Sequence, residues 1–153
     1  MSFSIAVQYE DFNVGDEYTQ LVAGDKNAGA VVFFVGRVRE MNQARAVTGL
    51  SLEHYPGMTE KVLDDILATA KQRWDLNSAR IVHRVGQLYL SDQIVFVGVS
   101  SKHREDAFEA AEFLMDFLKT RAPFWKKETT LQGDVWVGEN KKDEIAAKRW
   151  QES

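Results

Sequence analysis

The chain has 153 residues, of which 44 % are hydrophobic and 27 % are charged, as in an ordinary globular domain. A chain of this length is predicted to form one domain spanning residues 1–153. Its formal net charge is -4, with 23 acidic and 19 basic side chains, which argues against a general nucleic-acid-binding surface. It contains no cysteine, which excludes a disulfide, a thiolate nucleophile and a persulfide carrier.

Export and membrane insertion are not expected. Apolar runs such as residues 30–35 are only as long as a strand, and the opening residues are too short and too polar for a signal peptide. A cytoplasmic location is therefore predicted. His54, His83 and His103 lack metal-binding spacing, so no metal or other cofactor is expected. His54 and His83 have no acid or serine partner at a spacing that would indicate a catalytic triad, and they are assigned no role.

The first half of the chain contains strand signals followed by a helix signal. Residues 11–23 are expected to hold a short helix, and strands are predicted at 30–38 and 47–55. The segment 39–46 has neither strand nor helix periodicity and is expected to be a mobile loop. Apolar residues at every third or fourth position then predict a helix over 56–74.

The second half repeats the order of strands and helix. Strands are predicted at 80–85 and 93–101, and a second long helix over 102–119, which Pro123 prevents from continuing. Two strands and a short final helix follow, at 124–129, 134–137 and 141–150. This order predicts an α+β fold, a single domain in which two main helices pack on a mainly antiparallel sheet.

Positive charge is concentrated after the second long helix of this acidic chain. Four cations and two large aromatic residues lie there around the proline, namely Lys119, Arg121, Lys126, Lys127, Phe124 and Trp125. Such a cluster suits an anion. Two simpler explanations stay open: Lys119 as the cation that commonly ends a helix, and the strand lysines as protection against edge-to-edge aggregation.

Two further basic clusters precede this one. The expected helix start places Lys102, His103 and Arg104 at the positive end of the helix dipole, where cations are unfavourable. Because the same helix end attracts anions, the cluster indicates a phosphate site. A buried strand also becomes basic at Arg37 and Arg39 as it leaves the core. Solvated surface residues at a helix start and at a strand end remain the alternative explanation of these clusters.

Five segments resemble the large, catalytic subunit of molybdopterin synthase. In chain order they are FVGRVR (34–39), LEHYPGMTEK (52–61), HRVGQL (83–88), SSKHR (100–104) and LKTRAPFWKK (118–127). The second and the last are long and unusual in composition, and the likeness spans nearly the whole chain. The resemblance implies a hammerhead-like α/β arrangement with a small additional β region.

The resemblance also implies an activity and partners. It implies a sulfurtransferase of molybdenum cofactor biosynthesis that converts cyclic pyranopterin monophosphate (precursor Z) into molybdopterin by installing two sulfurs as a dithiolene. The sulfur would come from the C-terminal thiocarboxylate of a small ubiquitin-like subunit, which fits the absence of cysteine here. A homodimer with one small subunit at each end, a heterotetramer, is expected.

The matching motifs imply two catalytic lysines, Lys119 and Lys126. They imply a substrate pocket in which these lysines are joined by Arg37, Val38, Arg39, His103, Arg104, Lys127 and Glu128. Because Arg104 and Lys119 would be about 22 Å apart along one helix axis, one small pterin cannot touch both. We therefore expect a pocket shared across the dimer, with His103 and Arg104 of one subunit facing the two lysines of the other.

Two other functions are compatible with the basic clusters. One is a noncatalytic phosphate or single-stranded nucleic-acid binding module that uses the aromatic residues as a stacking platform. The net acidity of the chain argues against it, and no nucleic acid or membrane is expected as a partner. The other is an adaptor that binds a ubiquitin-like partner without chemistry.

Overall fold

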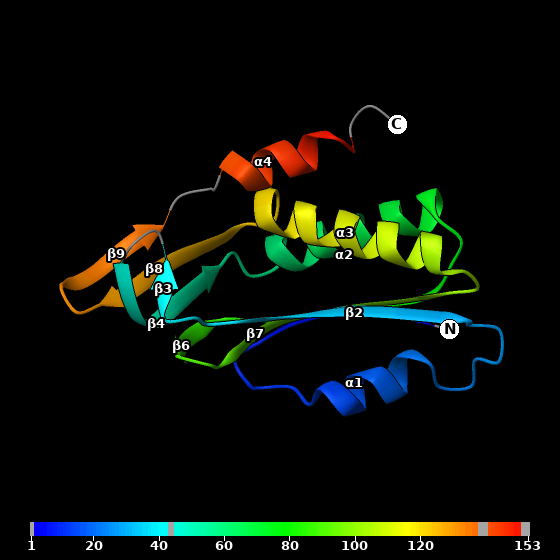
Figure 1. Cartoon of the computed structure of the whole chain (residues 1–153), viewed down its shortest axis with the longest axis horizontal. Coiled ribbons are helices and arrows are strands. Elements are labelled where there is room, and N and C mark those ends of the chain that lie inside the picture. Colours follow the sequence, from blue (N-terminus) through cyan, green and yellow to red (C-terminus); the bar gives the residue numbers. More distant parts are fainter. Residues whose placement is uncertain (1, 43–44, 138–140, 151–153) are drawn as a thin grey trace.

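The fold is that of a computed structural model, which describes residues 2–42, 45–137 and 141–150 (Figure 1). The helices are α1 (Val14–Leu21), α2 (Met58–Arg73), α3 (Arg104–Thr120) and α4 (Lys141–Lys148). The strands are β1 (Phe3–Gln8), β2 (Ala30–Arg37), β3 (Met41–Asn42), β4 (Arg45–His54), β5 (Leu76–Arg84), β6 (Gly86–Tyr89), β7 (Gln93–Ser101), β8 (Phe124–Thr130) and β9 (Gly133–Val137). They form two sheets.

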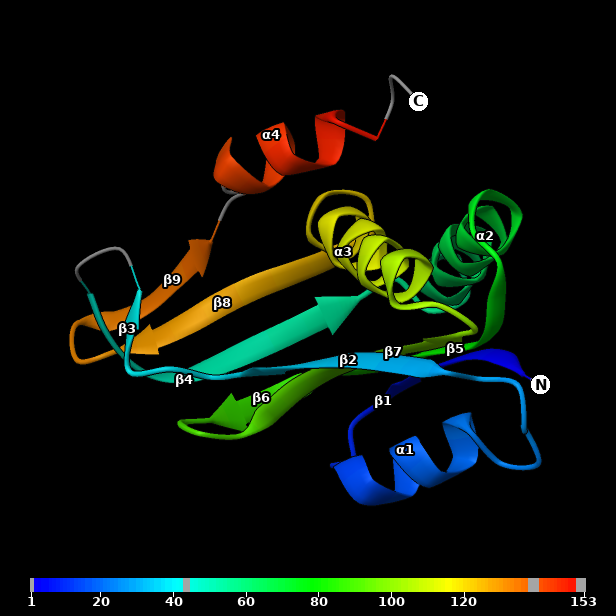
Figure 2. The same ribbon diagram turned by 45° about the vertical axis from the view of Figure 1, so that its right-hand side comes forward.

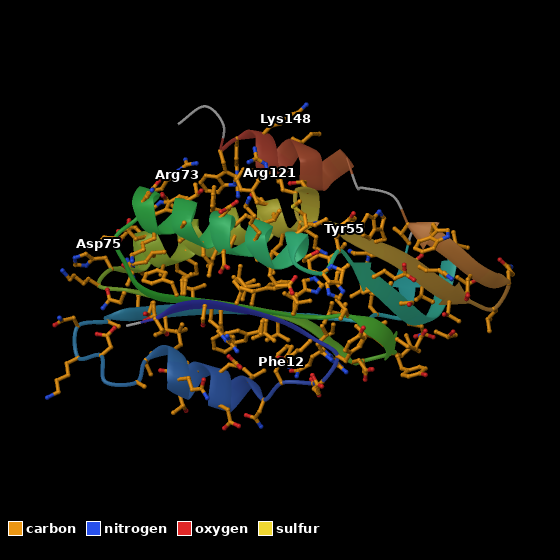
Figure 3. The ribbon with its side chains drawn as sticks, turned by 180° about the vertical axis from the view of Figure 1, so that it is seen from behind. Phe12, Tyr55, Arg73, Asp75, Arg121 and Lys148 are labelled. Carbon is orange, nitrogen blue, oxygen red and sulfur yellow. The ribbon has the colours of Figure 1, made fainter. Side chains whose placement is uncertain are left out.

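The first sheet, with strand order β1-β5-β7-β2, lies between two helical layers. β1 is parallel to β5, whereas β7 is antiparallel to both β5 and β2. α2 and α3 cover one face and α1 covers the other (Figures 1 and 2). Since side chains alternate along a strand, each face has its own apolar cluster. Ile81 and Val97 belong to the large cluster with α2 and α3, and Val82 and Phe96 pack with Phe12 near α1 (Figure 3).

The second sheet lies to one side of the first and has the order β3-β4-β8-β9, with β6 also paired to β4 (Figure 2). β4 and β8 are antiparallel, with Leu52 opposite Lys126 and Leu50 opposite Glu128. A small second core forms here from Val38, Leu50, Leu52 and Leu88. β8 therefore carries polar residues directly beside apolar ones of β4.

The helix α3 connects the two sheets. It buries Ala110, Leu114 and Phe117 along one side, which is the three-to-four residue spacing of a helix face. Its last turn carries Lys119, and the chain enters the second sheet through β8 soon afterwards (Figure 2). The end of α3 thus lies at the junction of the two sheets.

The C-terminal segment packs on the outer side of the helix layer. Trp150 Nε1 donates a hydrogen bond of 2.6 Å to Asp116 of α3, and Arg73 of α2 donates one of 2.9 Å to the Trp150 carbonyl oxygen. Arg73 and Lys148 both lie on this side (Figure 3). None of the helices in the described ranges is long and apolar enough to cross a membrane.

The predicted fold class is confirmed: two main helices pack on mainly antiparallel strands, and the additional β region is the second sheet. β1, β3 and β6 have no counterpart among the predicted strands. The expected loop over 39–46 is wrong at both ends, where Met41 pairs with Ala46 and Asn42 with Arg45. Such short pairings rest on backbone hydrogen bonds, so they need no apolar periodicity; residues 43–44 lie outside the described residues.

Candidate functional site

A pocket of about 280 Å³ lies at the junction of the two sheets, beside the end of α3. Its polar side chains come from four different elements and are Arg37, His83, Lys119 and Lys126. The remaining lining residues are apolar or glycine, and Phe34, Met115 and Phe124 are the largest of them. Among the residues that the structure describes, no acidic side chain lines this pocket. The lining therefore supplies cations and hydrogen-bond donors on an apolar wall, which suits an anion with a flat apolar part.

The two lysines reach the pocket from opposite sides of one turn. Lys119 projects from the last turn of α3 and is exposed, whereas Lys126 lies on β8 and is half-buried. Alternation along β8 places Phe124, Lys126 and Glu128 on the inner face of the strand. The turn thus brings two ammonium groups to one small volume, which favours binding of a negative charge.

Thr59 at the start of α2 holds this turn in place. Its Oγ1 accepts a hydrogen bond of 2.9 Å from the Tyr55 backbone N–H and donates one of 3.4 Å to the carbonyl oxygen of Pro123. Thr59 is fully buried. Gly57 just before it has φ 84°, a conformation that favours glycine, and its N–H donates to Glu60 Oε1. The segment 55–60 therefore positions the lysine-bearing turn rather than lining the pocket.

His83 forms part of the pocket wall and is held on two sides. Its ring stacks on Phe124, with 3.9 Å between centroids and 16° between planes. Its Nδ1 lies 2.8 Å from the carbonyl oxygen of Arg84. Burial lowers the pKa of the imidazole from its usual 6.5 to about 4, and the positive charges of Lys126 and Lys119 act in the same direction. The ring is therefore neutral at physiological pH.

Arg37 closes the pocket at the end of β2. Its Nε donates a hydrogen bond of 3.3 Å to the carbonyl oxygen of Ser91. The preceding Gly36 is required by close packing, since a Cβ there would lie 2.9 Å from Val95 Cγ1 and 3.3 Å from the Phe34 ring. Glycine thus lets the Phe34 ring lie close to the strand that carries Arg37.

The structure brings three of the nine proposed site residues into this pocket, Arg37, Lys119 and Lys126. Val38 is buried in the second core, Arg39 is exposed, and Glu128 is buried on β8. Lys127 faces the other side of β8, with its Nζ 5.0 Å from the centroid of the Trp136 ring. His103 and Arg104 are exposed at the opposite end of α3.

His83 is the polar lining residue that sequence reasoning missed. A signal for it exists: Ala79, Ile81 and His83 alternate along β5, so the histidine continues the face that packs toward the helix layer. Its contact with Phe124 could not be predicted, because it joins residues that are distant in sequence.

The described residues of the site do not form a metal centre. In the described ranges, no three histidine or acidic side chains come together in a way that could hold a metal ion. The pocket instead presents guanidinium and ammonium groups, which bind phosphates and carboxylates. Fold and pocket together define a class of protein, an α+β domain with a cationic, cysteine-free pocket at the end of its central helix.

Comparison with known proteins specifies this class. Residues 7–121 match the family model described as MoaE protein. The chain is 58 % identical to the molybdopterin synthase catalytic subunit of Yersinia pestis, over 95 % of this chain and 96 % of that one. The chain therefore belongs to the MoaE family of molybdopterin synthase catalytic subunits.

Solved structures share the fold over most of its length. The molybdopterin cofactor biosynthesis protein E of Burkholderia multivorans has a TM-score of 0.83 and 48 % identity, covering 99 % of this chain and 98 % of that one. A chain in the protein–protein complex of subunits 1 and 2 of molybdopterin-converting factor from Helicobacter pylori has a TM-score of 0.71. It is 23 % identical, with 90 % of this chain and 91 % of that one covered, so this second likeness concerns the fold alone.

Proposed function

We propose that this chain is the catalytic subunit of a molybdopterin synthase. In this function it transfers sulfur from the C-terminal thiocarboxylate of a small ubiquitin-like subunit to cyclic pyranopterin monophosphate, which gives the dithiolene of molybdopterin. The observation that carries the proposal is the convergence of Arg37, Lys119 and Lys126 on one apolar-walled pocket in a member of this family. Both reactants are anions, and the pocket lining supplies cations.

The chain itself supplies no sulfur, because it contains no cysteine. A thiocarboxylate carries one sulfur atom, so the two sulfurs of the dithiolene require two thiocarboxylate equivalents. We assign Lys119 to the carbonyl of the incoming thiocarboxylate or to the acyl intermediate. Lys126 acts in proton transfer or stabilises the negative charge that develops as sulfur is transferred.

The pocket is completed by a second copy of the chain in this proposal. α3 runs from Arg104 to Thr120, so its two ends are about 24 Å apart, and Arg104 is too far from Lys119 to meet the same pterin. His103 and Arg104 of one subunit, together with Arg39, bind the phosphate of the substrate held by the lysines of its dimer mate. Lys127 and Glu128 follow Lys126 on β8 and support it.

The assembly is a homodimer with one small subunit at each end. The 58 % identical relative is named a catalytic subunit, a name that implies a further subunit, which supports a protein partner here. The exposed Lys119 at the pocket edge would meet the thiocarboxylate tail of that partner. We place the reaction in the cytoplasm.

Reconstitution tests the proposal directly. The purified chain is mixed with a thiocarboxylated small subunit and cyclic pyranopterin monophosphate, and formation of the dithiolene product is measured. Lys119→Ala and Lys119→Arg should abolish product while retaining partner binding. Lys61→Ala, an exposed lysine of α2 outside the pocket, is the matched control and should retain full activity. Partner binding without any turnover by the unchanged chain would instead identify an adaptor.

A further inference from the structure

The protonation of His83 can be read from its one side-chain hydrogen bond within the described part of the chain. A carbonyl oxygen only accepts, so the contact between Nδ1 and the Arg84 carbonyl requires the proton to be on Nδ1. The ring is neutral at physiological pH, because burial and the two lysines disfavour the imidazolium. Nε2 is therefore unprotonated and carries a lone pair.

This lone pair is distinctive within the pocket. The other polar lining residues are Arg37, Lys119 and Lys126, whose side chains donate hydrogen bonds and accept none. Met115 offers only a thioether sulfur, a weak acceptor. Among the described side chains that line the pocket, Nε2 of His83 is consequently the one strong hydrogen-bond acceptor.

The acceptor is also preorganised. The stacking on Phe124 and the hydrogen bond to the Arg84 carbonyl hold the ring on its face and on its Nδ1 edge. His83 is only 8 % exposed, and it contributes to the pocket lining. A rigid acceptor on a largely buried side chain discriminates strongly between ligands, because a ligand that displaces water without a matching donor leaves it unpaired beside an apolar wall.

We propose that Nε2 of His83 accepts a hydrogen bond from an N–H or O–H group of the bound pterin. The inference rests on the proposed function and deepens it. The three cations select for the anionic part of the ligand, whereas His83 selects for a donor on its heterocyclic part. His83 is thus a specificity-determining residue that orients the pterin ring against the reacting sulfur.

Three substitutions of His83 distinguish the contributions of the aromatic ring, of Nδ1 and of Nε2. His83→Phe keeps an aromatic ring for Phe124 but removes both nitrogens. His83→Asn keeps a donor near the Nδ1 position but has no atom at Nε2, whereas His83→Gln places an amide oxygen near Nε2. Each variant is studied as the full chain in complex with the small subunit in its carboxylate form, which binds without transferring sulfur.

The measured quantities are the dissociation constants of cyclic pyranopterin monophosphate and of sulfate, an anion with no donor at neutral pH. We expect His83→Phe and His83→Asn to bind the pterin about 10- to 100-fold more weakly, with a smaller loss in His83→Gln. Sulfate affinity should stay within about twofold of the unchanged chain. In ¹⁵N-histidine spectra, the Nε2 resonance should move when the pterin binds and stay in place when sulfate binds.

Several results would overturn the inference. Pterin affinity of His83→Phe within twofold of the unchanged chain would do so, and so would a parallel loss of sulfate affinity, which indicates a collapsed pocket. If His83→Phe does not fold, the other two variants and the spectra decide. Failure of the unchanged chain to make product with the thiocarboxylated small subunit overturns the proposed function itself. Turnover by the variants in that assay, with unaltered pterin affinity, overturns the His83 contact alone.

Discussion

The imidazole of His83 lies flat on the ring of Phe124, at 3.9 Å between centroids, and thereby joins the first sheet to the strand that carries Lys126. The two residues belong to two of the segments that resemble molybdopterin synthase. A third segment reaches the same place, since His54 of β4 pairs with Phe124 in the register of the second sheet. Phe124 is thus the point where the elements around the pocket meet.

Removal of the Phe124 ring should therefore affect both stability and activity. Phe124→Ala leaves a gap beside His83 and is expected to lower the free energy of unfolding by about 2–3 kcal/mol, because the ring is half-buried. Urea denaturation gives this value, and the reconstituted assay should show reduced turnover. Trp125→Ala is the matched control: its side chain is 46 % exposed on the opposite face of β8, and we expect a change below about 1 kcal/mol. Equal effects of the two changes would contradict this role of Phe124.

The pH dependence of stability should carry the signature of His83. The pKa of this imidazole is about 4 in the folded chain and about 6.5 when unfolded, so only the unfolded chain takes up the proton between these values. The contribution that the neutral His83 makes to the free energy of unfolding is fully present above pH 6.5. It is lost as the pH falls toward 4, by about 3 kcal/mol in total. Urea denaturation at a series of pH values measures this. His83→Gln should flatten the curve in this window, and a variant curve parallel to that of the unchanged chain would rule the assignment out.

The hydroxyl of Thr59 should matter for positioning rather than for direct contact with substrate. Thr59→Val keeps the shape but leaves the Tyr55 N–H and the Pro123 carbonyl without this partner, which is expected to cost about 1–3 kcal/mol of stability. Because the lysine-bearing turn is then less constrained, turnover should fall while partner binding is kept. Thr69→Val is the control, since its hydroxyl donates to the Asp65 carbonyl on the exposed side of the same helix. A Thr59 variant with normal turnover would show that the turn is held by other contacts.

The sequence predicts the local features of this molecule better than the contacts between distant segments. Periodicity predicts α2 and α3 to within two residues at each end, because each helix presents one continuous apolar face. β6 has only four residues, and β1 is half-buried throughout, so neither has a strong pattern of its own. Their pairing with β4 and β5 depends on chain segments far away in sequence.

The same division applies to the site. Charge clustering points to the stretch 119–127, because cations stand out in an acidic chain, and the family resemblance then selects Lys119 and Lys126 within it. The role of Thr59 could not be predicted, since its contact with Pro123 spans 64 positions. His83 differs again, because its position in an apolar strand is visible whereas its neutral state depends on burial and on lysines that the fold brings near.

The proposal that each pocket is shared between two subunits predicts complementation between two inactive variants. Lys119→Ala removes the lysine from the subunit's own pocket. Arg104→Ala removes the arginine that a subunit contributes to the pocket of the other subunit. Random mixing of equal amounts makes half of the dimers hybrid, and each hybrid has one intact pocket and one that lacks both residues. Dithiolene formation should then recover to about a quarter of the unchanged level, once the two variants have been unfolded and refolded together to exchange subunits.

The control is Lys119→Ala mixed with Lys126→Ala. This mixture should not recover, because both lysines serve the same pocket from one subunit. If the Lys119 and Arg104 variants also fail to complement although size-exclusion and mass measurements confirm hybrid dimers, each pocket belongs to a single subunit.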